Sequence, residues 1–130
     1  SKDIDMEVFS IKATEETPEI TLNPVTGEYS ISHRSLPENA IGFYAPVFDW
    51  IEKFSQNPPV NELSFIFNLE YFNTASAKQI AKILLMLEKL SEKIDVIVIW
   101  KYKKDDVDMM SSGLRFSKLL NMEFEIQEVE

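Results

Sequence analysis

The stretch that decides the fold is LSFIFNLEYFNTASAKQIAKILLMLEKLSEKIDVIVIW, residues Leu63 to Trp100. Its first part, Leu63 to Tyr71, alternates bulky apolar side chains with mixed ones, which is the period of a pleated strand. Asn73-Thr74-Ala75-Ser76 follows, and such small residues with hydrogen-bonding side chains favour the start of a helix. The sequence therefore predicts a strand that leads through a short polar junction into a helix.

The second half of this stretch predicts the helix and a further strand. The run 94–100 is an almost unbroken series of β-branched residues, which is typical of a strand covered on both faces. A strand, a helix and a strand at this spacing predict a parallel βαβ unit with a right-handed crossover. The apolar stripe expected on the helix consists of Ile80, Ile83, Leu84, Leu87 and Leu90.

Length and composition predict one globular domain. The chain has 130 residues, of which 45% are apolar, and we expect residues 6–130 to form a single domain. Residues 1–5 are interpreted as an N-terminal tail or a cloning remnant ahead of Met6. The chain has no cysteine, which excludes disulfides and thiolate chemistry and favours a cytoplasmic location. No apolar run approaches the ~20 residues that cross a bilayer.

The charge balance excludes some partners. There are 13 basic and 22 acidic residues, a formal net charge of −9. Such a surface repels phosphate backbones and anionic lipid surfaces, so we expect neither nucleic acid nor a membrane as partner.

Weaker patterns outside the central unit complete the predicted architecture. A first strand is expected within Val8–Ala13, and Thr17 to Ser32 reads as a β-hairpin around the turn Asn23–Gly27. A last strand is expected at Glu123–Val129. The expected fold class is α/β, with a mixed sheet, an N-terminal β-hairpin, the parallel βαβ unit and about three main helices.

Two further helices belong to this architecture. Ser35-Leu36-Pro37-Glu38 is a possible capping box for the first, and Pro46 predicts a kink or a late start near Phe43. The third helix is expected at Val107–Leu120. The core face expected on the first helix is Phe43, Val47, Trp50, Ile51 and Phe54, and on the third it is Met110, Leu114 and Leu119.

Residues that are able to carry catalysis are few. The cluster Asp105-Asp106-Val107-Asp108 lacks the glycine and the distal glutamate of a calcium loop, so a solvated helix start is favoured over a metal site. His33 is the single histidine and follows a strand, without a sign of a catalytic triad. No glycine-rich phosphate loop is present. We therefore expect no enzymatic activity, no cofactor and no metal.

The junction Asn73–Ser76 allows two interpretations. In the first, Asn73 or Thr74 caps the helix and contributes about 1 kcal/mol. In the second, a hydroxyl here accepts a phosphate, which the free N–H groups and the positive helix end would tolerate. Tyr71 and Phe72 come immediately before, at the edge of the sheet where α/β folds commonly place their sites.

A family resemblance rests on short pieces of sequence that are spread over nearly the whole chain and occur in the same order as in the family. The chain resembles the SiaC family of bacterial regulatory phosphoproteins, and it departs from the family pattern in having Ser112, where an acidic residue usually precedes Gly113. The matching pieces are Thr17-Pro18-Glu19-Ile20, Ser35-Leu36-Pro37-Glu38-Asn39, Trp50-Ile51, Leu69-Glu70-Tyr71-Phe72-Asn73-Thr74-Ala75-Ser76, and Trp100-Lys101-Tyr102 followed by Asp105 and Asp108.

The resemblance implies a STAS-like fold, similar to anti-sigma-factor antagonists of the SpoIIAA type, and a role in partner switching. In that family, a GHKL-type serine/threonine kinase phosphorylates the threonine of the Asn-Thr-x-Ser piece, and a PPM-type phosphatase removes the phosphate. The unphosphorylated family member binds and activates a diguanylate cyclase, which raises cyclic di-GMP and favours aggregation or biofilm. By position, the resemblance implies that Thr74 is the phosphoacceptor and that Tyr71, Phe72, Asn73 and Ser76 form its partner-binding neighbourhood.

Three alternatives stay open at this point. The fold would also suit a small-ligand sensor with Trp50, Trp100 or Tyr102 lining the pocket. A small enzyme built on the carboxylates of 105–108 is a second alternative. In the third, Ser76 and not Thr74 takes the phosphate.

Overall fold

A computed structural model describes residues 6–130, so the interpretation of residues 1–5 lies outside the described range. In this range three strands come first, and three helices then alternate with three more strands, as the sequence predicts for an α/β domain. In chain order the elements are β1 (Phe9–Ile11), β2 (Glu19–Asn23), β3 (Glu28–Ser35), α1 (Ala40–Gln56), β4 (Glu62–Phe72), α2 (Thr74–Leu90), β5 (Asp95–Lys103), α3 (Val107–Leu119) and β6 (Glu123–Val129).

The strands form one sheet in which their spatial order equals their order in the sequence. β1, β2 and β3 pair antiparallel, whereas β3 to β6 pair parallel. The predicted hairpin and the predicted parallel βαβ unit are both confirmed, and the mixed sheet agrees with the STAS-like class. Within the described range, no helix has the length and hydropathy to span a membrane.

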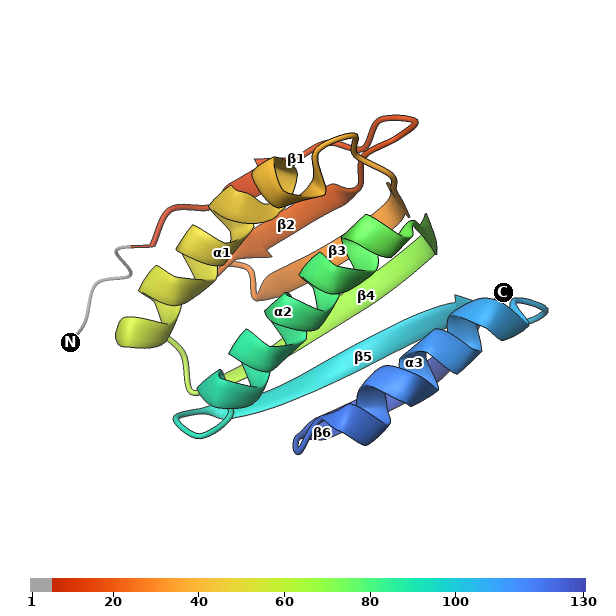
Figure 1. The fold of residues 1–130 in the computed structure, drawn as a ribbon. Coiled ribbons are helices and arrows are strands. Elements are labelled where there is room, and N and C mark those ends of the chain that lie inside the picture. The colour runs from red at the N-terminus through yellow and green to blue at the C-terminus, as the bar shows by residue number, and fades with distance from the viewer. Residues whose placement is uncertain (1–5) are drawn as a thin grey trace.

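All three helices lie on one face of the sheet (Figure 1). The reason is that each parallel crossover is right-handed and steps to the next strand in the same direction, so each returns over the same face. The core fills the space between the two layers. Its fully buried members include Ile20, Leu22, Ile31, Tyr44, Val47, Phe67, Ile80, Ile83, Leu84, Val98 and Trp100.

The expectation that the strand at 94–100 is covered on both faces is wrong. In β5, Val96, Val98 and Trp100 are buried beneath the helices, but Ile97 and Ile99 on the other face are only half-buried. The run of β-branched residues reflects β propensity on a strand in the middle of a sheet, and not a second layer.

The start of the first helix also differs from the prediction. α1 begins at Ala40, and its cap is Asn39, whose Oδ1 accepts a hydrogen bond from the Gly42 N–H at 3.1 Å. Ser35 is the last residue of β3 and takes no part in a capping box. Pro46 lies inside α1, and the late start that was expected near Phe43 does not occur.

The core face of α3 is displaced from the prediction by one residue. Met109 and Gly113 are the buried positions, while Leu114 and Leu119 are exposed. The reason is Trp100 of β5, whose indole N–H donates to the Met109 carbonyl at 3.0 Å. A Cβ at Gly113 would lie 2.4 Å from Cδ1 of Trp100, so only glycine allows this close approach.

Candidate functional site

The candidate site is the junction between β4 and α2, at the end of the sheet where the parallel strands finish. Asn73 is the N-cap of α2, and its Oδ1 accepts a hydrogen bond from the Ser76 N–H at 2.8 Å. The Asn73 N–H donates to the carbonyl of Ser35 at 3.1 Å. The first N–H groups of a helix have no acceptor within the helix. At this helix start, the N–H groups of Thr74 and Ala75 are available to a ligand.

Two hydroxyls of this junction have opposite environments. Thr74 is the first residue of α2 and is exposed. Ser76, two residues later, is fully buried at 0% exposure. A kinase must bring a nucleotide phosphate to the hydroxyl it modifies, so only Thr74 is accessible in this conformation.

Ser76 belongs to a buried hydroxyl network that also contains Ser35 and Tyr44. The Ser35 hydroxyl donates to Oγ of Ser76 at 2.8 Å, and the Ser76 hydroxyl donates to the Ser35 carbonyl at 3.0 Å. Oγ of Ser35 lies 2.6 Å from Oη of Tyr44. These bonds join the end of β3, the second turn of α1 and the first turn of α2, and so fix the helix start that carries Thr74.

Burial raises the pKa of Tyr44 to about 12, and the hydrogen bond with Ser35 offsets part of that rise. Because the charged phenolate is disfavoured in this apolar setting, the phenol stays neutral over the physiological pH range. The network is therefore built from neutral hydroxyls, and no charge beneath the junction opposes a phosphate above it.

The predicted partner-binding residues divide into surface and interior. Tyr71 is 52% exposed and pairs in register with Arg34, which is also exposed. Phe72 is half-buried and packs edge-on against Trp100, with ring centroids 6.1 Å apart. Ser76, being buried, has no surface to offer a partner.

A surface depression next to Thr74 separates the first turns of α1 and α2. Ile41 of α1 is 71% exposed there, and Lys78 lies one turn after Thr74 on α2. The two helix starts face the same end of the sheet, so their positive dipole ends both border the depression. The lining residues are Glu38, Asn39, Ala40, Ile41, Thr74, Ala75, Lys78 and Gln79.

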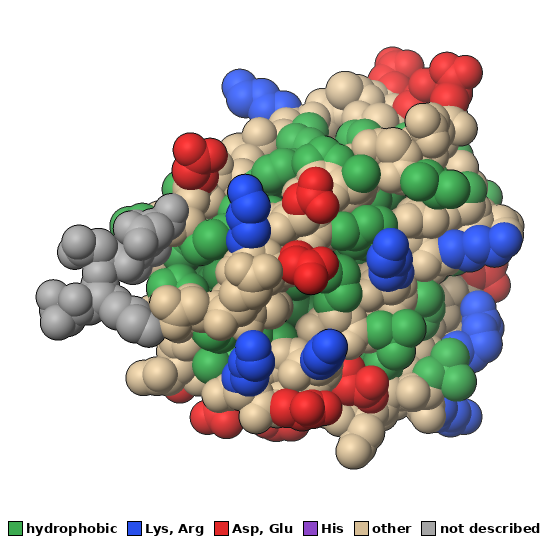
Figure 2. Space-filling view, turned by 60° about the vertical axis from the view of Figure 1, so that its left-hand side comes forward, with side chains coloured by type: hydrophobic (Ala, Val, Ile, Leu, Met, Phe, Trp, Pro, Cys, Tyr) green, Lys and Arg blue, Asp and Glu red, His purple; other side chains and the backbone are tan. Residues whose placement is uncertain are grey.

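The charged side chains on the face drawn in Figure 2 are of both signs and are interspersed with hydrophobic ones. The net negative charge of the chain is therefore not gathered into one acidic field on this face. A partner that docks here meets apolar contacts divided by single charges, which suits a protein surface better than a polyanion.

The carboxylates near the start of α3 have a structural role. Oδ1 of Asp106 accepts a hydrogen bond from the Met109 N–H at 2.9 Å, so Asp106 is the N-cap of α3. Among residues 6–130, no group of three or more His, Cys, Asp or Glu side chains is placed to hold a metal ion. The favoured interpretation of 105–108 as a helix start agrees with this geometry.

The aromatic side chains proposed for a sensor pocket belong to the packing. Trp100 is fully buried and lies against the rings of Phe67, Phe72, Phe116 and Phe124. Trp50 is 8% exposed, and its indole N–H donates to the backbone carbonyl of Glu7 at 2.7 Å. These contacts explain the two tryptophans without a ligand.

Comparison with known proteins places this site in a family. The sequence profile described as "SiaC family regulatory phosphoprotein" matches residues 11–129. The chain belongs to the SiaC family of regulatory phosphoproteins. The match covers every element from β2 to β6 in full, including the β4–α2 junction, and the last residue of β1.

Relatives of this SiaC-family chain come from Pseudomonas aeruginosa. An uncharacterized protein of strain UCBPP-PA14 is 29% identical over 126 residues, which cover 94% of this chain and 97% of that protein. The crystal structure of apo-SiaC is similar with a TM-score of 0.85 at 29% identity, covering 94% of this chain and 99% of that one.

A further relative is SiaC in the crystal structure of the diguanylate cyclase SiaD in complex with its activator SiaC. It is similar to this SiaC-family chain with a TM-score of 0.85 at 28% identity. The likeness covers 93% of this chain and 99% of that one. That SiaC protein therefore acts as a cyclase activator on the same fold.

Sequence reasoning missed two residues that support the junction. Ser35 was interpreted as a helix cap, and Tyr44 was not distinguished from its aromatic neighbours. Neither carries a local signal: Ser35 bonds to Ser76, 41 residues later, and Tyr44 joins the network only through its bond with Ser35. Only the parallel pairing of β3 with β4 brings Ser35 and Phe72 side by side.

Proposed function

We propose that this SiaC-family protein is a phosphorylation-controlled activator of a diguanylate cyclase, with Thr74 as the phosphoacceptor. The observation that carries the proposal is the exposed Thr74 hydroxyl at the start of α2, in a fold whose relative SiaC is crystallised with the cyclase that it activates. The protein would act in the cytoplasm as a binding partner without catalysis of its own.

The junction is suited to hold a phosphate without loss of the fold. A dianion on Thr74 would accept hydrogen bonds from the N–H groups of Thr74 and Ala75 and interact favourably with the helix dipole. Lys78, four residues later on the same side of α2, would supply a positive charge. The network below the junction is neutral and fully bonded, so it imposes no electrostatic penalty.

The effect of phosphorylation would fall on the partner. The phosphate adds nearly two negative charges and bulk beside the depression that contains Ile41 and Lys78. A partner surface that packs against Ile41 and Tyr71 would have to desolvate that dianion, which opposes binding. A GHKL-type kinase and a PPM-type phosphatase would set the ratio of the two forms.

Affinity capture with tagged variants tests the proposal. Thr74→Ala should retain a diguanylate cyclase at least as well as the unmodified protein. Thr74→Glu should bind the purified cyclase at least about tenfold more weakly, because it places a fixed charge at the docking surface.

A matched control separates the position of the charge from its mere presence. Thr26 is an exposed threonine in the turn between β2 and β3, at the other end of the sheet. Thr26→Glu should bind the cyclase as the wild type does. Equal weakening by Thr26→Glu and Thr74→Glu, or cyclase binding that neither variant alters, would contradict the proposed switch.

A further inference from the structure

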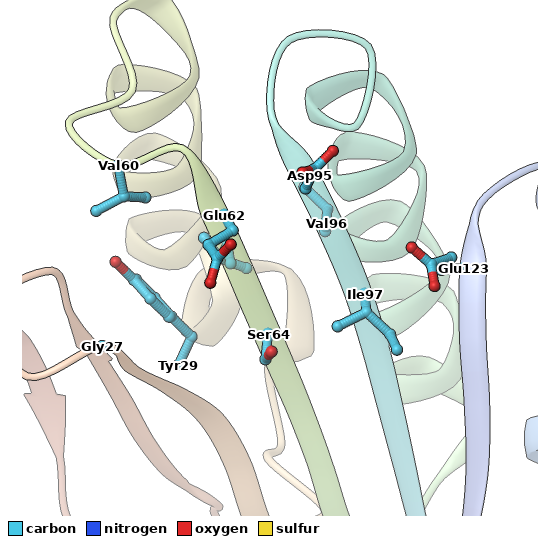
Figure 3. A pocket seen from close by; sticks show the side chains of 10 residues that line it. Gly27, Tyr29, Val60, Glu62, Ser64, Asp95, Val96, Ile97 and Glu123 are labelled. Atoms are coloured by element: carbon cyan, nitrogen blue, oxygen red, sulfur yellow. The ribbon is translucent and has the colours of Figure 1, made fainter.

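One face of the sheet is left without a covering layer by the described part of the chain. All three helices lie on the other face, and α2, which carries Thr74, is among them (Figure 1). Parallel strands such as β3 to β6 occur almost only in sheets that are covered on both faces. Figure 3 shows the beginning of this open face, with the helices behind the strands. A layer supplied by another chain would complete the usual arrangement.

The middle of the open face is apolar. Ile66 of β4 pairs in register with Ile99 of β5, and Ile97 lies two residues before Ile99 on the same face. These three side chains, the isoleucine patch, are half-buried, whereas the residues between them along each strand are buried beneath the helices. Ser30 pairs with Ile66 and Ser64 pairs with Ile97, so small polar side chains border the isoleucine patch.

The two ends of the open face differ in charge. At the acidic end, where the parallel strands begin, four carboxylates project: Glu28, Glu62, Asp95 and Glu123. At the basic end, where the strands finish, three cations accompany one carboxylate: Arg34, Lys101 and Lys103 with Glu70. Glu19 of β2 and Glu125 of β6 lie between the two ends. The isoleucine patch therefore separates an acidic end from a mainly basic one.

This charge pattern indicates a second copy of the chain as the partner. A uniformly acidic or uniformly basic partner would match one end of the open face and would be repelled at the other. A second copy turned about a two-fold axis that runs across the strands places its basic end over the acidic end of the first, and the reverse. With that axis between Ile97 and Ile99, these two residues face each other across the interface. Asp95 then lies opposite Lys101 of the second copy.

The open face is large enough for a dimer of modest affinity. Six strands about 4.8 Å apart and roughly 20 Å long give about 600 Å² per chain. Two copies would bury about 1,200 Å² in total, at the lower end of the range for specific interfaces. Because charge fixes the orientation and the apolar area is small, we expect a dissociation constant in the micromolar range that rises with salt.

We propose that the protein forms a two-fold symmetric dimer through its open face, with the isoleucine patches in contact and the acidic end of each copy over the basic end of the other. Burial of the three isoleucines from each chain is the main favourable contribution, and the charged ends set the orientation. The dimer is independent of the function proposed for Thr74, because α2 lies on the opposite face of the sheet and stays accessible.

Sedimentation velocity of the full chain over a concentration series tests the dimer, because the monomer has a mass of 15.0 kDa. The wild type should become dimeric at micromolar concentration, and Ile99→Asp should stay monomeric. Asp95→Lys and Lys101→Asp should each weaken dimerisation at least about tenfold, since each places like charges opposite one another twice in the symmetric dimer. Lys118→Asp, the same change of charge at an exposed position of α3, should dimerise as the wild type does.

A charge swap tests the orientation of the two copies. Asp95 and Lys101 lie about 20 Å apart along one strand, too far for contact within a chain. The double variant Asp95→Lys with Lys101→Asp should therefore regain dimerisation close to that of the wild type. An equimolar mixture of the two single variants should form a heterodimer, which also shows that each single variant is folded.

The proposal is overturned if the wild type stays monomeric at submillimolar concentration, or if Lys118→Asp weakens the dimer as much as Lys101→Asp does. It is also overturned if neither the double variant nor the mixture restores dimerisation. A monomeric wild type that binds a diguanylate cyclase, together with an Ile99→Asp variant that does not, would assign the open face to the cyclase and overturn the dimer.

Discussion

Two buried tyrosines at opposite ends of the sheet show how differently one side chain is used in this protein. Tyr44 lies below the Thr74 junction, and its hydroxyl is 2.6 Å from Oγ of Ser35. Tyr29 lies at the other end, and its hydroxyl has no partner within residues 6–130. At the first end the buried hydroxyls bond to one another and hold in place the helix start that carries the exposed Thr74. The second leaves one buried hydroxyl without a hydrogen bond in the described part of the chain.

The largest expected difference between the two ends appears at alkaline pH, through Tyr44. Its folded pKa is about 12 against an ordinary value of 10.0. A raised folded pKa means that the unfolded chain loses its proton first, so the stabilisation is complete below pH 10 and is lost as the pH rises toward 12. Over that window the free energy of unfolding should fall by roughly 2 to 3 kcal/mol because of this group.

Urea unfolding across this pH range, compared between the wild type and Tyr44→Phe, isolates the contribution from the lysines that titrate alongside. The variant should lose less stability than the wild type between pH 10 and 12. Parallel curves for the two proteins would show that Tyr44 does not titrate as the structure requires.

Removal of the central member of the network should have the next largest effect. Ser35→Ala leaves the buried Tyr44 hydroxyl without its partner and should destabilise the protein by about 2 kcal/mol. Adding Tyr44→Phe should return part of this loss, because the orphaned hydroxyl is then absent. Chemical denaturation of the two single variants and the double variant measures the coupling, and strictly additive losses would contradict a direct bond.

The two tyrosines themselves provide the third comparison. Tyr44→Phe should cost about 1 kcal/mol of stability, since it removes a bonded hydroxyl. Tyr29→Phe should be neutral or slightly stabilising, because it removes a hydroxyl that is buried without a partner. Thermal unfolding under identical conditions compares them, and an equal loss in both variants would remove the distinction between the ends.

The smallest expected effect concerns the cap of α2. Asn73→Ala should cost about 0.5 to 1 kcal/mol, while Asn73→Asp should be nearly neutral because a carboxylate also accepts the Ser76 N–H. The same two substitutions at Asn39, the cap of α1, are a matched control. A lower denaturation midpoint for Asn73→Asp than for Asn73→Ala would contradict the capping geometry.

The sequence predicted the fold wherever the signal was local. The strand–junction–helix–strand unit and the N-terminal hairpin were found from periodicity and turn residues, and α2 begins at Thr74 within the polar junction as expected. Prediction from the sequence failed where contacts between distant residues determine which side chains are buried. The inward face of α3 depends on Trp100 meeting Gly113, and the open face of β5 depends on the direction of the crossovers.

The candidate site was predicted in the same uneven way. Thr74 and Asn73 stand in a recognisable local motif, and the structure places one on the surface and the other in the cap. The roles of Ser35, Tyr44 and Tyr29 have no local signature, because each depends on neighbours from distant strands or helices. The family resemblance favours Thr74 as the phosphoacceptor, and the complete burial of Ser76 is a physical reason against the neighbouring hydroxyl.

The central claim is that Thr74 is the switch, and mapping the phosphate tests it most directly. The protein would be incubated with the GHKL-type kinase proposed as its partner and with MgATP, analysed by tandem mass spectrometry, and then titrated into a diguanylate cyclase assay. The account predicts one phosphate on Thr74, normal modification of a folded Ser76→Ala variant, and loss of cyclase activation by the phosphorylated form. A phosphate on Ser76 or elsewhere, or full activation by Thr74-phosphorylated protein, would contradict it.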